Sequence, residues 1–150
     1  MNTSYLLKIK YLLGLSNSKE IFDWGFQEIE QGNNDNEMLE LVTLKSDNYG
    51  GIIEKLTKIS SSQIINKCEV VYYFYCLFDD IFEKSNDIVE VEELLIHFYN
   101  LVKDDISFDE AEKLSFSIIE NDLSLRKSNL SSQISDDDIM IFLRNGKQIS

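Results

Sequence analysis

Hydrophobic residues along the chain recur mostly at intervals of three and four, which is the period of an amphipathic α-helix. The 150-residue sequence contains no proline, the residue that most often interrupts helices. The clearest apolar stripe consists of Ile88, Val91, Leu95, Phe98 and Val102. Helices are predicted at residues 4–14, 18–31, 36–45, 51–59, 62–84, 87–103, 108–120 and 136–145, with a short helical segment at 122–129. The pattern therefore predicts an all-α fold.

Capping residues support several of the predicted helix starts. Ser107 and Glu110 form an S-x-x-E capping box at the start of one helix. Ser60–Ser62 offer N-caps for the long helix that follows them. Ser135 precedes three aspartates, Asp136–Asp138, in the first turn of the last helix, where the helix dipole favours negative charge. These signals agree with the helical boundaries that the apolar pattern predicts.

No repeat or linker divides the chain, and 150 residues can bury one hydrophobic core. The apolar N-terminal segment MNTSYLLKIKYLLGL lacks the long hydrophobic region and cleavage site of a signal peptide, so a first helix is expected there. We predict one all-helical domain over residues 1–150, a bundle of about seven to eight helices around a central aromatic-rich helix at about 62–84.

The segment VVYYFYCLFDDIFEK, residues 70–84, lies in this central helix and allows several readings. Its apolar run is far shorter than the roughly 20 residues of a membrane span. A strand over residues 70–78 is a rival, because Val, Tyr and Phe favour sheets. Helical spacing favours a helix, with one face formed by Val71, Phe74, Phe78 and Phe82. The opposite face then carries Tyr72, Cys76, Asp79, Asp80 and Glu83.

The charge is strongly negative and unevenly distributed. The formal net charge is −13, and residues 79–140 contain 17 acidic but only five basic residues. Such a field repels nucleic-acid phosphates, which proteins bind with Lys and Arg. The composition therefore argues against nucleic-acid and anionic membrane partners, and it favours a basic protein partner that opposite charge would steer.

Asp79, Asp80 and Glu83 match the DDxxE shape of the aspartate-rich helices in terpenoid synthases, whose carboxylates hold Mg²⁺. The chain has no second motif of this kind and few basic residues to hold a diphosphate. A solvated acidic face is the simpler explanation, so we predict no metal site and no cofactor.

The sequence also lacks a recognisable catalytic motif. His97 is its only histidine, and Glu93 one helical turn earlier predicts an exposed Glu–His pair. Cys68 and Cys76 are too far apart on one helix for a disulfide, and we expect them to pack between helices. Free thiols point to the reducing cytoplasm. We therefore predict a cytoplasmic protein that is not an enzyme.

Acidic side chains near tyrosines form the candidate binding residues, although a purely solubilising acidic surface remains an alternative. Interfaces favour Tyr in their centre, while charges at the rim steer association. The predicted anchors are Tyr72 and Tyr73. The predicted steering residues are Asp79, Asp80, Glu83, Asp104, Asp105, Asp136, Asp137 and Asp138.

The N-terminal third is similar to an opening found in small uncharacterised bacterial proteins, through Leu13-Gly14-Leu15, Asp23-Trp24 and residues 37–41. The overall profile resembles bacterial immunity proteins, which are small, acidic, helical and cytoplasmic. That resemblance implies binding and neutralisation of a cognate toxin domain, such as a basic nuclease. The alternatives are a nucleic-acid mimic that inhibits a DNA-binding defence protein, and a divalent-metal enzyme using the DDxxE residues.

Overall fold

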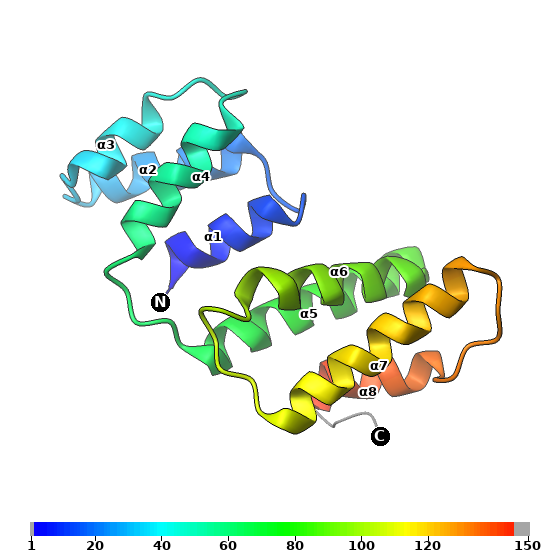
Figure 1. The fold of residues 1–150 in the computed structure, drawn as a ribbon. Helices are drawn as coiled ribbons and strands as arrows, with labels where there is room; N and C mark the ends of the chain where they lie inside the picture. Colours follow the sequence, from blue (N-terminus) through cyan, green and yellow to red (C-terminus); the bar gives the residue numbers. More distant parts are fainter. Residues whose placement is uncertain (1, 146–150) are drawn as a thin grey trace. The chain divides into compact units, whose positions relative to one another are not determined.

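The computed structural model describes residues 2–145, and these residues form eight α-helices and no strand (Figure 1). The all-α prediction is confirmed, and residues 70–78 are helical. The helices are α1 (Thr3–Leu12), α2 (Ser18–Glu30), α3 (Asn36–Val42), α4 (Tyr49–Ser60), α5 (Lys67–Ser85), α6 (Ile88–Val102), α7 (Glu110–Lys127) and α8 (Asp136–Asn145).

The contacts within the chain fall into two compact units, Met1–Asn66 and Lys67–Ser150. Helices α1 to α4 belong to the N-terminal unit, and α5 to α8 belong to the C-terminal unit. This division does not test whether the two units fold as one domain, so the single domain expected over residues 1–150 stays a prediction. All ten of the predicted binding residues lie in the C-terminal unit.

The N-terminal unit is built around a small apolar core. Its fully buried members are Ile21, Met38, Leu41, Ile52 and Leu56, contributed by α2, α3 and α4. Gly25 lets α2 approach α3 closely, because a Cβ atom at this position would lie 2.6 Å from Cγ1 of Val42. The absence of a side chain at Gly25 is therefore a packing requirement of this unit.

The C-terminal unit has an aromatic core. Phe74 of α5 lies 4.9 Å from Phe98 of α6 between ring centroids, and Tyr75 lies 5.2 Å from Phe142 of α8. Phe116 of α7 completes the cluster at 5.6 Å from Phe142. Each ring buries a large apolar area, and the tilted and edge-on geometries are favourable ones for aromatic pairs. α6 packs against α5 and α7, while α8 packs against α5 (Figure 1).

The start of α5 differs from the prediction. The helix begins at Lys67, not near residue 62, because the side chain of Asn2 binds the preceding segment. The Asn2 amide donates to the carbonyl of Ile64 at 2.9 Å, and the backbone N–H of Asn66 donates to Asn2 Oδ1 at 2.9 Å. These bonds hold residues 64–66 outside the helix.

The predicted boundaries of α7 are also wrong. Residues 110–127 form one continuous helix where two segments were expected. Its capping box uses Asp109 and Glu112 rather than Ser107 and Glu110. Glu112 N–H donates to Asp109 Oδ1 at 2.8 Å, and Asp109 N–H donates to Glu112 Oε1 at 3.0 Å. Two candidate capping boxes overlap in the sequence, and the later one is formed, directly after the buried Phe108.

We predict that Gly25→Ala destabilises the N-terminal unit by about 1–3 kcal/mol, because the new methyl group overpacks the contact with Val42. Urea unfolding followed by the fluorescence of Trp24, the only tryptophan, measures the change in this unit. Gly50→Ala is the control, because a Cβ atom there meets nothing within 4 Å. Equal effects of the two substitutions would contradict the packing role of Gly25.

Candidate functional site: an acidic aromatic face and a buried carboxylate cluster

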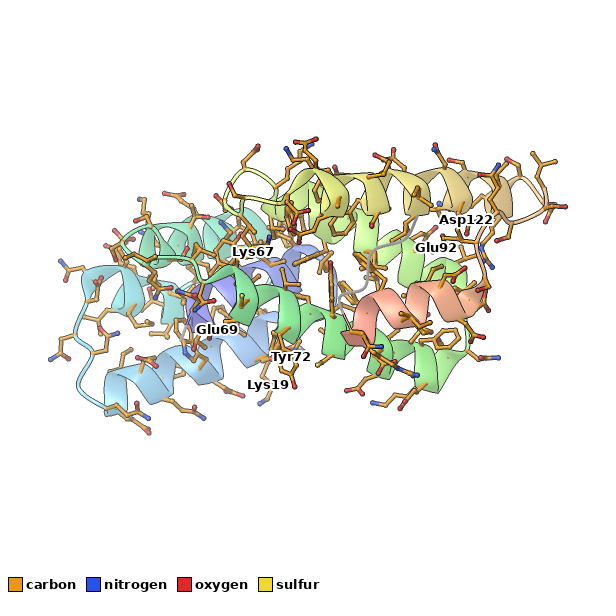
Figure 2. All side chains as sticks on the ribbon, turned by 90° about the horizontal axis from the view of Figure 1, so that it is seen from below. Lys19, Lys67, Glu69, Tyr72, Glu92 and Asp122 are labelled. Carbon is orange, nitrogen blue, oxygen red and sulfur yellow. The ribbon has the colours of Figure 1, made fainter. Side chains whose placement is uncertain are left out.

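One face of α5 is exposed and carries aromatic, thiol and acidic side chains. Its members, which we call the α5 face, are Tyr72, Tyr73, Cys76, Asp80 and Glu83. The exposed fraction of Tyr72 is 73%, and its side chain projects from α5 (Figure 2). Phe74 and Phe78 on the opposite side are fully buried. The two-faced helix that the spacing predicted is confirmed for Phe74 and Phe78, whereas Val71 and Phe82, which were also expected in the core, are only half-buried.

The two tyrosines of the α5 face have different surroundings. The ring of Tyr73 packs edge-on against the buried ring of Phe74, with 5.1 Å between the centroids. Tyr73 is therefore in contact with the core. Tyr72 lies one helical turn before Cys76, and a hydrogen bond with this thiol raises the pKa of Tyr72. Tyr72 is therefore a neutral phenol at neutral pH, with a large ring available for contact.

Both cysteines are exposed and free, so the expectation that they pack between helices is wrong. Cys68, Tyr72 and Cys76 recur at intervals of four residues, which places them together on the side of α5 away from Phe74. Val70 and Tyr75 take the buried positions instead.

Two of the predicted DDxxE acids are paired with an arginine from α8. Arg144 Nη2 lies 2.8 Å from Oδ1 of Asp79 and 3.6 Å from Oε1 of Glu83. The hydrogen bond with Asp79 is the main reason that the pKa of Arg144 is raised. Asp80 is exposed and has no ion-pair partner among the described residues. A cation of the chain itself thus sits where the metal hypothesis would place Mg²⁺, and residues 2–145 contain no group of three acids, histidines or cysteines arranged for a metal.

The three aspartates at the start of α8 differ in their roles. Asp138 caps the helix, since Ser135 N–H donates to its Oδ2 at 3.1 Å and its own N–H donates to Ser135 Oγ at 3.2 Å. Asp136 pairs with Arg126 Nη1 at 3.0 Å. Asp137 is exposed and lacks a hydrogen-bonding partner in the described chain. Of this group, only Asp136 forms an ion pair within residues 2–145, and the charge of Asp137 contributes to the raised pKa of Arg144.

Asp104 and Asp105 lie away from the other predicted acids. They follow the end of α6, where Asp105 N–H donates to the carbonyl of Val102 at 3.0 Å. Because α6 runs back along α5 after a short turn, this end lies beside the start of α5. Asp79 is 12 residues further along α5 than Lys67, or about 18 Å at 1.5 Å per residue. The structure does not bring Asp104 and Asp105 together with the acids of the α5 face.

Glu92 of α6 and Asp122 of α7, which were not among the predicted site residues, are labelled in Figure 2. They form a buried charge cluster with Arg126 of α7. Glu92 is 0% exposed and Asp122 is 1% exposed. Arg126 Nε lies 3.0 Å from Oε1 of Glu92 and 2.6 Å from Oδ2 of Asp122. Together with Asp136, three carboxylates surround one guanidinium, which joins α6, α7 and α8.

The two buried carboxyl groups have opposite pKa shifts. Burial is the main cause that raises the pKa of Glu92 to about 8, and the neighbouring Asp122 raises it further. Burial also opposes the ionisation of Asp122, but hydrogen bonds with Arg126, Glu92 and Ser132 outweigh it and lower the pKa of Asp122 to about 2. Because the two pKa values are shifted apart, Glu92 is the carboxyl group that holds a proton at neutral pH, and Asp122 is the one that is ionised.

Helical spacing could have revealed this cluster. Glu92 lies four residues after Ile88 and three before Leu95, within the buried stripe of α6. Asp122 follows Ile119 by three residues and Ser115 by seven on the buried side of α7. Charged residues at these core positions of the apolar pattern are the feature of the sequence that indicates a buried charge cluster.

The lone histidine is exposed, but it does not pair with Glu93 as predicted. Glu93 Oε1 lies 2.6 Å from Nζ of Lys127 on α7. This ion pair borders the buried cluster and leaves His97 at the surface. No catalytic arrangement around His97 follows from these contacts.

An open groove of about 490 Å³ lies between α1 and α2 in the N-terminal unit. Leu7 and Trp24 form its apolar part. Two of its charged side chains form an ion pair, since Lys19 Nζ lies 2.6 Å from Oδ2 of Asp23. The groove gives no indication of the chemistry of an occupant, and we assign none to it.

Comparison with protein-family models, with curated proteins and with solved structures gives no match to this chain. None of the helices in residues 2–145 is long and apolar enough to cross a membrane. Every functional residue named for this chain is therefore inferred from its own sequence and geometry.

We predict that Arg126→Met lowers the free energy of unfolding by about 3–5 kcal/mol, because it leaves the buried carboxylate of Asp122 without its cation. Urea unfolding followed by far-ultraviolet circular dichroism measures this loss. Arg144→Met is the matched control, since its ion pairs with Asp79 and Glu83 are exposed and we expect little change. Similar losses in both variants would contradict a special role of the buried cluster.

Proposed function

We propose that the protein is an immunity-type inhibitor that binds a cognate bacterial toxin domain, such as a basic nuclease, and occludes its active site. The observation that carries this proposal is the α5 face, where a Tyr72 side chain that is 73% exposed lies on the same helix face as the unpaired Asp80. Large exposed aromatic rings beside charge are the composition that protein interfaces favour.

The α5 face is suited to act as the centre of an interface. Tyr72 and Tyr73 come from a helix whose other side packs in the aromatic core, so a partner that covers them does not have to order the backbone that carries them. The phenol of Tyr72 can donate a hydrogen bond, and its ring can cover an apolar or cationic surface. In this proposal, Tyr72 and Tyr73 anchor the toxin domain.

In this proposal, the negative charge of the C-terminal unit steers the basic toxin domain towards the α5 face. Residues 67–150 carry 18 acidic and eight basic residues, a net charge of −10, whereas residues 1–66 carry a net charge of −3. Asp80 is exposed and forms no ion pair among the described residues, so its field extends into solvent. Asp137 is exposed as well, although its charge also acts on Arg144. Asp79, Glu83 and Asp136 contribute less, because Arg144 and Arg126 neutralise them in part. A basic toxin domain would be drawn to this unit.

The partner is expected in the cytoplasm, where an immunity protein must meet a toxin that has entered the cell. The two exposed free thiols, Cys68 and Cys76, support a reducing compartment. The proposal needs no cofactor and no metal. A toxin domain encoded by a neighbouring gene would be the first candidate partner, and co-expression of such a domain with this protein tests for a complex directly.

We predict that Asp80→Lys slows association with that toxin domain by about three- to tenfold at low salt and weakens the salt dependence of the rate. Biolayer interferometry at several salt concentrations measures both effects. Glu30→Lys is the control, because it makes the same charge change at an exposed helical position of the N-terminal unit.

Tyr72→Ala in the same assay separates anchoring from steering. This variant is expected to raise the dissociation rate by about thirtyfold with little change in association, since a central interface Tyr contributes about 2 kcal/mol. The proposal fails if no complex forms, or if both variants bind as tightly and as fast as the wild type. A binding partner that proves to be a DNA-binding protein without toxin activity would favour the nucleic-acid mimic.

A further inference from the structure

The buried cluster has an imbalance of charge. Arg126 is the cation that contacts Glu92, Asp122 and Asp136, at 3.0, 2.6 and 3.0 Å. Asp136 is half exposed and is stabilised by water, whereas Glu92 and Asp122 are almost completely buried. Two ionised carboxylates in the interior would face a single positive charge. An uncompensated buried charge is so costly that a group in this position takes up a proton instead.

The hydrogen bonds show which carboxyl group stays ionised. Asp122 accepts from Arg126 Nε at 2.6 Å, from Ser132 Oγ at 2.8 Å and from the backbone N–H of Gln133 at 3.0 Å. Neither side-chain oxygen of Glu92 accepts a hydrogen bond in residues 2–145, although both are buried. A protonated Glu92 would instead be a donor, and Asp122 is the acceptor beside it.

We propose that Glu92 is a proton-binding site, which holds a proton at neutral pH, shares it with Asp122, and loosens the segment Ser132–Asp136 when the proton leaves. This inference goes beyond the proposed function and does not depend on it.

The segment that connects α7 to α8 is held by the same groups. Asp122 binds the side chain of Ser132 and the backbone of Gln133, and Arg126 Nη2 donates to the carbonyl of Ile134 at 3.0 Å. The ion pair with Asp136 fixes the first residue of α8. A second negative charge next to Asp122 would compete for Arg126 and weaken each of these bonds.

The charged groups that face Glu92 come from two helices. Asp122 and Arg126 lie on α7 and Asp136 lies on α8, while the neighbouring Glu93 is paired with Lys127 of α7. Burial, Asp122 and Asp136 raise the pKa of Glu92, and Arg126 lowers it. The contributions that raise the pKa of Glu92 outweigh that of Arg126, so the protonated form of Glu92 is favoured.

The direction of the pH dependence follows from the shift. The pKa of Glu92 rises from 4.5 to about 8 on folding, so the folded protein binds more protons than the unfolded chain between these values. Stability therefore falls as pH rises through this window and levels off above it. Asp122 acts in the opposite sense, because its lowered pKa adds stability that is lost only as pH falls from 3.8 towards 2.

The test compares the full-length chain with Glu92→Gln, whose amide has the shape of the protonated carboxyl group and remains a donor to Asp122. Urea unfolding is measured between about pH 5 and about pH 8.5, across the window of Glu92. We expect the midpoint of the wild type to fall with rising pH, and that of Glu92→Gln to fall by less than about half as much. Glu93→Gln, the same change at the next residue of α6, is expected to keep the slope of the wild type.

A second measurement needs no variant. The backbone N–H of Gln133 donates to Asp122, so its hydrogen-exchange protection, corrected for intrinsic exchange, should fall by about tenfold or more between about pH 6.5 and about pH 9. The N–H of Ile52, which donates to Asn48 in the N-terminal unit, is the control and should stay protected. An unchanged slope in Glu92→Gln, or constant protection of Gln133, would overturn the inference.

Discussion

The contact of one guanidinium with three carboxyl groups joins three of the four helices of the C-terminal unit. Arg126 joins Glu92 of α6, Asp122 of α7 and Asp136 of α8, and it also binds the backbone at Ile134. The aromatic core brings the same helices together, but apolar packing tolerates some sliding between them. The buried polar contacts require one register, because a displaced partner would leave a charge without compensation. The ion pair with Asp136 and the hydrogen bond at Ile134 tie the start of α8 to this contact.

A strongly acidic unit must keep most of its negative charge at the surface, and any carboxylate in its interior needs a positively charged partner. Arg144, Lys127, Lys67 and Lys113 each pair with acids near the surface, and Arg126 serves the interior. Where acids are left unpaired, as at Asp80 and Asp137, they lie in solvent. The same distribution lowers self-repulsion within the unit and leaves a negative field that a basic partner would meet.

The periodic parts of the fold could be predicted from the sequence. The stripe on α6 is buried at all five predicted positions, and the start of α8 after Ser135 is correct. The start of α5 could not be predicted, because it depends on hydrogen bonds with Asn2, more than 60 residues earlier. The acids of the candidate site were found as charges, but their pairing with Arg126 and Arg144 depends on how the helices pack. The burial of Glu92 was not predicted, because acidic residues are usually exposed. Its position within the apolar stripe of α6 nevertheless indicates that its side chain faces the core.

The central claim is that a neutral Glu92 completes the cluster around Arg126. The most direct measurement is a pH titration of the side-chain carboxyl ¹³C resonance of Glu92 in the folded protein, assigned by its loss in Glu92→Gln. If Glu92 is neutral in the folded protein at pH 7, the resonance titrates near pH 8. A titration near the ordinary value of 4.5 would show an ionised Glu92 at neutral pH and would contradict the central claim.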